Sequence, residues 1–176
     1  MYTLFPDSEV FQKERPTKIT NAQKIAFYKK LAKEIRKSKW SSSPEDDIVE
    51  DLESLYPFNG NGYELAKKLE NYGKKAVYSI DTDLCEWLEC IDSEYREIIK
   101  SNVKQWVKAH NPQPKFKIGS LLLITEKINF QLPVGKNVYI TGINDKEAYY
   151  LINEEFKKNN GICIDFEKAE RCCIVT

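Results

Sequence analysis

The chain has 176 residues, enough for one large or two small domains, and its 41% hydrophobic residues, with ten Tyr, eight Phe and three Trp, exclude a disordered polypeptide. The longest strongly apolar run, residues 121–124, is too short to cross a bilayer, and residues 1–7 lack the basic and apolar regions of a secretory signal. We therefore expect a soluble, cytoplasmic protein without membrane association. The five cysteines, an odd number, are expected to be free thiols in a reducing compartment.

The formal net charge is zero, but the charges are distributed unevenly along the chain. Residues 12–39 carry ten Lys or Arg and two Asp or Glu, a net charge of +8. Residues 40–114 carry eight basic and fifteen acidic residues, a net charge of −7, whereas residues 115–176 have a net charge of +1. Two interpretations are open: the basic segment binds an external polyanion, or it packs against the acidic segment so that each neutralises the other.

The spacing of the apolar residues changes at Asn111–Pro114. Before this segment they recur at helical spacing, and after it they alternate and are mostly β-branched or aromatic. This change predicts an α+β fold in which an N-terminal helical bundle is followed by a small β-rich unit. We expect an extended arm at 1–19, a helical domain at 20–111 and a β-barrel domain at 115–176, with the two domains separable.

Five helices are predicted in the first part of the chain, from their capping residues and apolar stripes. Thr20 and Gln23 have the spacing of a capping box, which begins a strongly basic helix. Ser43 is the expected cap of the second helix, Gly73 ends the third, and Asp81 caps the fourth. The predicted helices begin at Thr20, Pro44, Tyr63, Asp81 and Asp92 or Ser93, and the last ends near His110.

Five or six short strands are predicted in the last 60 residues or so, with turn signals at Pro133–Gly135, Asn144–Asp145 and Asn159–Gly161. Because closing a sheet removes its exposed edges, this many short strands favours a small barrel. The predicted strands cover residues 116–125, 128–131, 137–142, 147–152, 162–164 and 171–175.

Three segments in this part of the chain have the pattern of strands in a small barrel: Phe116–Ser120, Val138–Ile143 and Ala148–Ile152. Through these segments, the C-terminal third of the chain resembles an SH3-like small β-barrel. Barrels of this kind bind peptides, proteins or nucleic acids, so the resemblance implies a binding module. The chain departs from signalling-type SH3 domains, because it has no obvious acidic loop paired with an aromatic shelf for a proline-rich ligand.

The segment Leu55–Glu70 in the helical half is similar to uncharacterised small proteins of bacterial phages and plasmids. This resemblance implies a mobile-element origin and names no activity.

No motif for catalysis or metal binding is present. His110 is the only histidine and would have to serve any Cys–His or Ser–His pair, yet no nucleophile motif accompanies it, and a helix-terminal role is favoured. A zinc site using Cys163, Cys172 and His110 is less favoured than buried thiols, and the acidic run at 45–53 lacks the glycine of a calcium loop. We therefore expect no enzymatic activity, no cofactor and no metal.

The favoured function is non-enzymatic binding of another macromolecule. We expect a phage or mobile-element accessory protein that binds and inhibits a host protein complex, in the manner of an anti-defence protein. The alternative is a nucleic-acid-binding module that uses the basic helix at 24–39 and the barrel. The expected binding residues, all on that helix, are Lys29, Lys30, Lys33, Arg36 and Lys37.

Two interpretations of the last four residues, Cys173–Thr176, are open. They have the form of a prenylation box, although Thr is not a favoured final residue. They also suit a closing strand of the barrel with Cys173 or Ile174 facing the core, in which case Cys173 is structural.

Overall fold

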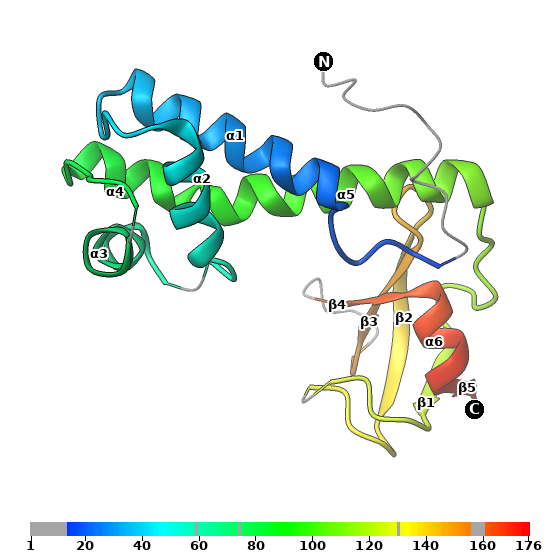
Figure 1. Cartoon of the computed structure of the whole chain (residues 1–176). Coiled ribbons are helices and arrows are strands. Elements are labelled where there is room, and N and C mark those ends of the chain that lie inside the picture. The colour runs from blue at the N-terminus through cyan, green and yellow to red at the C-terminus, as the bar shows by residue number, and fades with distance from the viewer. Residues whose placement is uncertain (1–13, 59, 74, 130, 156–160) are drawn as a thin grey trace. The chain divides into compact units, whose positions relative to one another are not determined.

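The computed structural model describes residues 14–58, 60–73, 75–129, 131–155 and 161–176. Its first part is helical and its C-terminal part contains an antiparallel sheet, which confirms the α+β class (Figure 1). The described residues form two compact units, which we call the helical unit (within 16–101) and the sheet unit (within 102–176, together with Glu14 and Arg15).

The helices confirm the prediction from capping signals. Thr20 and Gln23 form the capping box, and Oδ1 of Asp81 accepts the N–H of Leu84 at 2.8 Å. Gly73 ends the third helix by donating its N–H to the carbonyl of Leu69 at 2.9 Å. The helices are α1 (Asn21–Lys37), α2 (Glu45–Ser54), α3 (Gly62–Tyr72), α4 (Thr82–Glu89) and α5 (Ile91–His110).

The start of α2 differs from the prediction. Pro44 is the N-cap residue and makes no side-chain capping bond. Ser43, the expected cap, instead accepts the backbone N–H of Val77 on its hydroxyl oxygen at 3.1 Å. Three acidic residues in the first turn still suit the positive end of the helix dipole. The serine therefore connects two loops rather than beginning the helix.

The core of the helical unit combines aliphatic stripes with an aromatic cluster. α1 packs on α2, and α3 packs on α4. The rings of Phe27, Phe58 and Tyr95 lie with centroids 5.6–6.4 Å apart and edge-on, an arrangement that aromatic pairs prefer. Fully buried aliphatic side chains complete this core: Leu31, Ile35, Ile48, Leu52, Leu65, Leu69, Leu84, Leu88 and Ile91.

The backbones of α3 and α4 approach closely at Gly62. A Cβ atom on this residue would overlap the carbonyl oxygen of Cys85 and lie 2.7 Å from its carbonyl carbon. Only a residue without a side chain fits there, because the obstructing atoms belong to the backbone of another helix.

Within the described residues, the sheet has five antiparallel strands in the order β4-β3-β2-β1-β5. A register shift between Ile140 and Gly142 marks a bulge in the second strand. The last strand pairs with the first, with Cys173 opposite Ile124, so the C-terminal residues form an edge strand of the sheet. The strands are β1 (Leu121–Ile124), β2 (Asn137–Asn144), β3 (Tyr149–Asn153), β4 (Ile162–Asp165) and β5 (Cys173–Val175).

Three predictions for this region differ from the structure. The described residues of 128–131 form no strand, because the side chain of Asn129 accepts the N–H groups of Gln131 and Leu132, both at 2.9 Å, and so turns the chain. Residues from 166 onward form a helix before the last strand begins, α6 (Phe166–Cys172), which packs against β3, β4 and β5. The first strand also begins at Leu121 rather than at residue 116.

The division between the units lies within α5, between Ser101 and Asn102, whereas the sequence placed a boundary after residue 111. The helix does end at His110, as the change of period predicted. Its last turns, however, belong to the sheet unit, where Trp106 is 4% exposed and packs in the core with Val107 beside it. Apolar spacing identifies a helix but not the core in which each turn is buried.

The predicted arm at 1–19 is described only from Glu14, and residues 1–13 lie outside the described residues. Residues 14–19 contain no helix or strand. Arg15 is held in the sheet unit, where its guanidinium lies 3.0 Å from the carboxylate of Asp165. It also donates to the carbonyls of Glu147 and Ala148 at 2.7 and 3.0 Å, so the arm is fixed at this residue.

No helix in the described part of the chain is long and apolar enough to cross a membrane.

We predict that Gly62→Ala lowers the free energy of unfolding by about 3 kcal/mol, near the upper end for overpacking, because the new methyl group meets the α4 backbone. Gly135→Ala is the comparison, since Gly135 has a φ of 84° but no atom within 4 Å of the position that a Cβ would take. Gly135→Ala should lower the free energy of unfolding by only about 1 kcal/mol, because alanine is disfavoured in the left-handed conformation. Urea unfolding followed by circular dichroism measures both, and equal effects would contradict the close approach.

We also predict an alkaline loss of stability that depends on Cys173. Its side chain is buried, and burial, followed by the neighbouring Cys172, raises the pKa of its thiol from 9.0 to about 11. The unfolded chain then loses this proton first. The contribution of the Cys173 thiol to the free energy of unfolding is therefore constant below pH 9 and falls between pH 9 and 11 by about 1.4 kcal/mol per pH unit. Cys173→Ser should flatten the curve measured by urea unfolding from about pH 8 to 10. Identical slopes in the two proteins would contradict the prediction.

Candidate functional site

The helix α1 has one buried and one basic face. Its buried residues are Phe27, Tyr28, Leu31, Ala32 and Ile35. On the opposite side Lys29, Lys33 and Arg36 follow one another at i, i+4 and i+7 and therefore share a face. Lys30 and Lys37 flank them. All five are exposed, and we call this set of five residues the α1 basic face.

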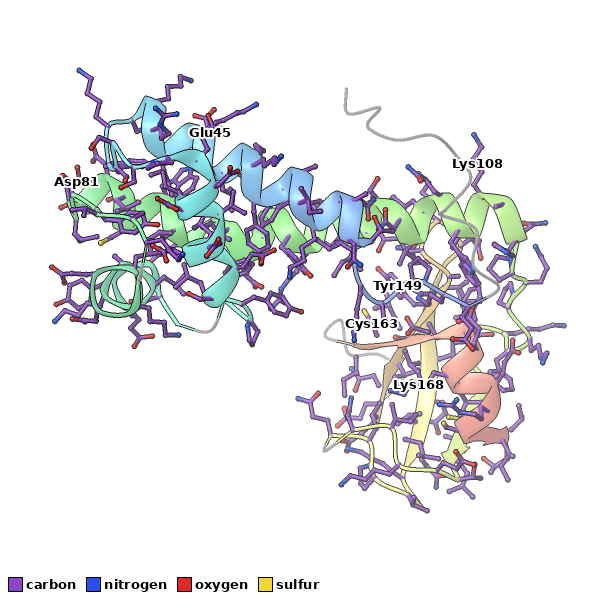
Figure 2. The ribbon with its side chains drawn as sticks, viewed as in Figure 1. Glu45, Asp81, Lys108, Tyr149, Cys163 and Lys168 are labelled. Carbon is purple, nitrogen blue, oxygen red and sulfur yellow. The ribbon has the colours of Figure 1, made fainter. Side chains whose placement is uncertain are left out.

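Several basic residues of α1 pair with acidic residues of the same unit. Nζ of Lys30 lies 2.6 Å from Oε2 of Glu94 in α5, and Nη1 of Arg36 lies 3.6 Å from Oε1 of Glu45, which is labelled in Figure 2. Lys24, outside the α1 basic face, lies 3.4 Å from Glu53. Such exposed pairs contribute less than about 1 kcal/mol each. At these contacts the basic segment does neutralise the acidic one, as the second interpretation of the charge pattern proposed.

The remaining charge of the α1 basic face is concentrated on its outermost lysines. Among the described residues, no carboxylate lies within 4 Å of the ammonium group of Lys29 or Lys33. Lys37 has Glu34, one turn earlier in the same helix, at 3.6 Å. The apolar side chain of Ile25, one turn before Lys29, is 51% exposed. The surface is therefore positive with an apolar margin.

A shallow hollow of about 420 Å³ lies at the C-terminal end of α1. Its lining combines cationic side chains with hydroxyl groups and includes no acidic residue among those described. The lining residues are Arg36, Lys37, Lys39, Ser41 and Ser42.

The backbone that forms this hollow reverses direction in a tight turn after α1. Lys39 has a φ of 61° and donates its N–H to the carbonyl of Arg36 at 3.1 Å, while the N–H of Trp40 reaches the carbonyl of Ile35 at 3.0 Å. This pair of bonds is the Schellman motif, in which the left-handed residue is usually glycine. Ser41 is 5% exposed, and its hydroxyl oxygen accepts the N–H of Ser43 at 3.2 Å.

The acidic residues at 45–53 form no metal-binding cluster among the described residues. Of these residues Asp51 alone is buried, at 3% exposed. Its carboxylate accepts the N–H groups of Ala76 at 2.9 Å and Lys75 at 3.3 Å, and the hydroxyl of Tyr78 at 3.3 Å. Burial, followed by the charge of Asp51, raises the pKa of the Tyr78 phenol. Asp51 is therefore an anchor for the segment between α3 and α4.

His110 lies at the end of α5, where Nδ1 is 3.0 Å from the carbonyl oxygen of Trp106 and the ring stacks on the Trp106 indole with centroids 5.1 Å apart. This is the helix-terminal role favoured by the sequence. Cys163 is exposed as a residue, but its sulfur is partly desolvated by neighbouring atoms. This desolvation, followed by the charges of Asp165 and Glu147, raises the pKa of the thiol and so reduces the fraction present as thiolate.

Within the ranges that the structure describes, no group of three His, Cys, Asp or Glu residues is placed to hold a metal ion. The zinc set Cys163, Cys172 and His110 is thus not brought together. The five basic residues expected to bind a partner lie exposed on α1, as helical spacing predicts, whereas Lys39, Ser41 and Ser42 were not among the expected site residues. The serines at 41–43 and Pro44 indicate a loop, but no glycine marks the left-handed turn at Lys39, so the sequence alone did not reveal the hollow.

No family model, curated protein or solved structure matches this chain.

We predict that Asp51→Ala lowers the free energy of unfolding by about 3 kcal/mol, because the N–H of Ala76 and its neighbours lose their buried acceptor. Glu50→Ala is the matched control. Its exposed carboxylate lies 3.7 Å from the ammonium group of Lys75, so its loss should cost less than about 0.5 kcal/mol. Thermal and urea unfolding measure the difference, and similar effects from the two changes would show that Asp51 is not an anchor.

Proposed function

We propose that the chain is a non-enzymatic binding protein and that the α1 basic face is its contact surface for an acidic region of another protein. The observation that carries the proposal is the exposed row of Lys29, Lys33 and Arg36 on a helix whose opposite face is fully anchored in a core. A rigid helix holds these charges at fixed spacing, which favours recognition of a complementary pattern.

A protein partner is favoured over nucleic acid by the surroundings of the lysines. Ile25 adds exposed apolar area beside Lys29, as protein interfaces have at their centres. The aromatic residues of α1, Phe27 and Tyr28, are buried, so this helix offers no ring on which a base could stack. The pair of Lys30 with Glu94 also reduces the charge that this helix offers to a row of phosphates.

A host protein complex, bound by a phage or mobile-element protein with an anti-defence role, remains the favoured partner. This part of the proposal rests on the resemblance of Leu55–Glu70 to small proteins of phages and plasmids.

The sheet unit is proposed to be a partly closed SH3-like barrel that provides a second binding surface. The return of β5 to pair with β1 and the bulge between Ile140 and Gly142 support this proposal, because bulges introduce the curvature that a small barrel requires.

Nucleic-acid binding is the second candidate, because three cations at i, i+4 and i+7 can follow a row of phosphates. It predicts an affinity that falls steeply with salt and a partner that nuclease removes.

The proposal is tested by capture of partners from a bacterial lysate on the full chain and on the variant Lys29→Glu/Lys33→Glu. These two lysines are chosen because their reversal breaks no observed ion pair. The control is Lys108→Glu/Lys117→Glu, the same change of charge at two exposed lysines of the sheet unit, of which Lys108 is labelled in Figure 2.

We predict that the parent and the control retain one defined protein partner after nuclease treatment, whereas the α1 variant loses it. Purified partner should then bind the α1 variant at least about tenfold more weakly, a loss of about 1.4 kcal/mol. A partner set that nuclease abolishes supports the second candidate instead. Equal binding by the α1 variant and the control would exclude the α1 basic face from either function.

A further inference from the structure

We propose that the hollow at the end of α1 binds a phosphate-class oxyanion. This inference deepens the proposed function and rests on it, because Arg36 and Lys37 belong both to the hollow and to the α1 basic face. The hollow would give one end of the α1 basic face a site for a single phosphate group, whereas the rest of that face attracts acidic groups without a defined pocket.

The side chains around the hollow are the donors that a phosphate group requires. Arg36 offers a planar guanidinium that can bind two oxygens at once, and Lys37 and Lys39 add two ammonium groups. Ser42 adds an exposed hydroxyl. Three cations exceed what a single carboxylate needs, whereas a doubly charged group with three or more acceptor oxygens can engage them all.

The backbone beneath these donors is held from the inside by Trp40. Its indole N–H donates to Oδ2 of Asp81 at 3.2 Å, and its ring lies 5.5 Å from that of Trp87. Its carbonyl accepts the N–H of Ser79 at 2.7 Å. The turn that carries Lys39 and the two serines is therefore fixed before any ligand binds, which lowers the entropic cost of binding.

Lys39 occupies a position that its own side chain disfavours. A left-handed conformation is unfavourable for a residue with a Cβ atom, and glycine would avoid that cost. The lysine instead places a third cation at the hollow, and no carboxylate lies within 4 Å of its ammonium group among the described residues. Backbone strain that persists at a cluster of like-charged side chains is an indication of function.

Two carboxylates near the hollow compete with the ligand. Glu45 lies 3.6 Å from Arg36, and Glu34 lies 3.6 Å from Lys37. Both pairs are at least one-third exposed, so neither is strong enough to exclude a dianion. Releasing Arg36 from its carboxylate should therefore strengthen oxyanion binding.

The test is a titration of the full chain with inorganic phosphate at constant ionic strength, followed by the backbone amide signals of Lys39, Ser41 and Ser42 in nuclear magnetic resonance spectra. Chloride is the ionic control. Phenyl phosphate, titrated in the same way, distinguishes a free oxyanion from a phosphate ester on a larger molecule. We expect saturable shifts with at least one of the phosphates and none with chloride.

Three variants identify the site. Lys39→Gly should raise the melting temperature, because it relieves the left-handed strain, yet weaken phosphate binding about fivefold, the loss expected for one charged contact of about 1 kcal/mol. Glu45→Gln should tighten binding. Lys29→Gln, which removes a charge of the α1 basic face outside the hollow, should leave phosphate affinity unchanged.

The absence of saturation, equal shifts with chloride, or unchanged affinity in Lys39→Gly would each overturn the oxyanion site. These outcomes are independent of the lysate capture, in which the variant Lys29→Glu/Lys33→Glu tests the helix face without altering the hollow. Phosphate binding without a macromolecular partner would refute the proposed function alone, and the reverse result would refute the oxyanion site alone.

Discussion

The helical unit depends on the contacts of one buried residue, Trp40. Its backbone N–H donates to the carbonyl of Ile35 at the end of α1, and its carbonyl accepts the N–H of Ser79. Its indole N–H donates to the carboxylate of Asp81. Because the other carboxylate oxygen of Asp81 caps α4, the end of one helix and the start of another share a single side chain. The packing of Trp40 on Trp87 buries this junction. The positions of the turn residues at the hollow, Lys39, Ser41 and Ser42, follow from it.

Much of the fold was predictable because local chemistry determines helix ends. The capping box of Thr20, the stop at Gly73 and the cap of Asp81 are short-range signals, and each lies where expected. The short helix α6 was missed because its apolar contacts, Phe166, Ala169 and Cys172, extend over less than two turns. The strand expected at 128–131 does not form, because the side chain of Asn129 accepts the backbone N–H groups of Gln131 and Leu132, which a strand would have paired with its neighbour.

The exposed face of the candidate site was predictable from the sequence, but its ion pairs and its turn were not. The exposure of Lys29 and Lys33 follows from helical spacing, since the apolar stripe identifies the opposite face. The partners of the other basic residues did not follow, because Glu45 and Glu94 approach α1 only through tertiary packing. The left-handed turn at Lys39 was also beyond sequence reasoning, because the energy of buried contacts outweighs a backbone preference that normally indicates glycine.

The separation of charge within the helical unit has a consequence for the protein in concentrated solution. With a formal net charge of zero, no overall repulsion keeps two molecules apart. The α1 basic face of one molecule and exposed acidic residues of another, such as Asp46 and Glu50 on α2, attract each other over about one Debye length, roughly 10 Å at 0.1 M salt. Added salt screens this attraction, so the protein should salt in, becoming more soluble as ionic strength rises from a low value.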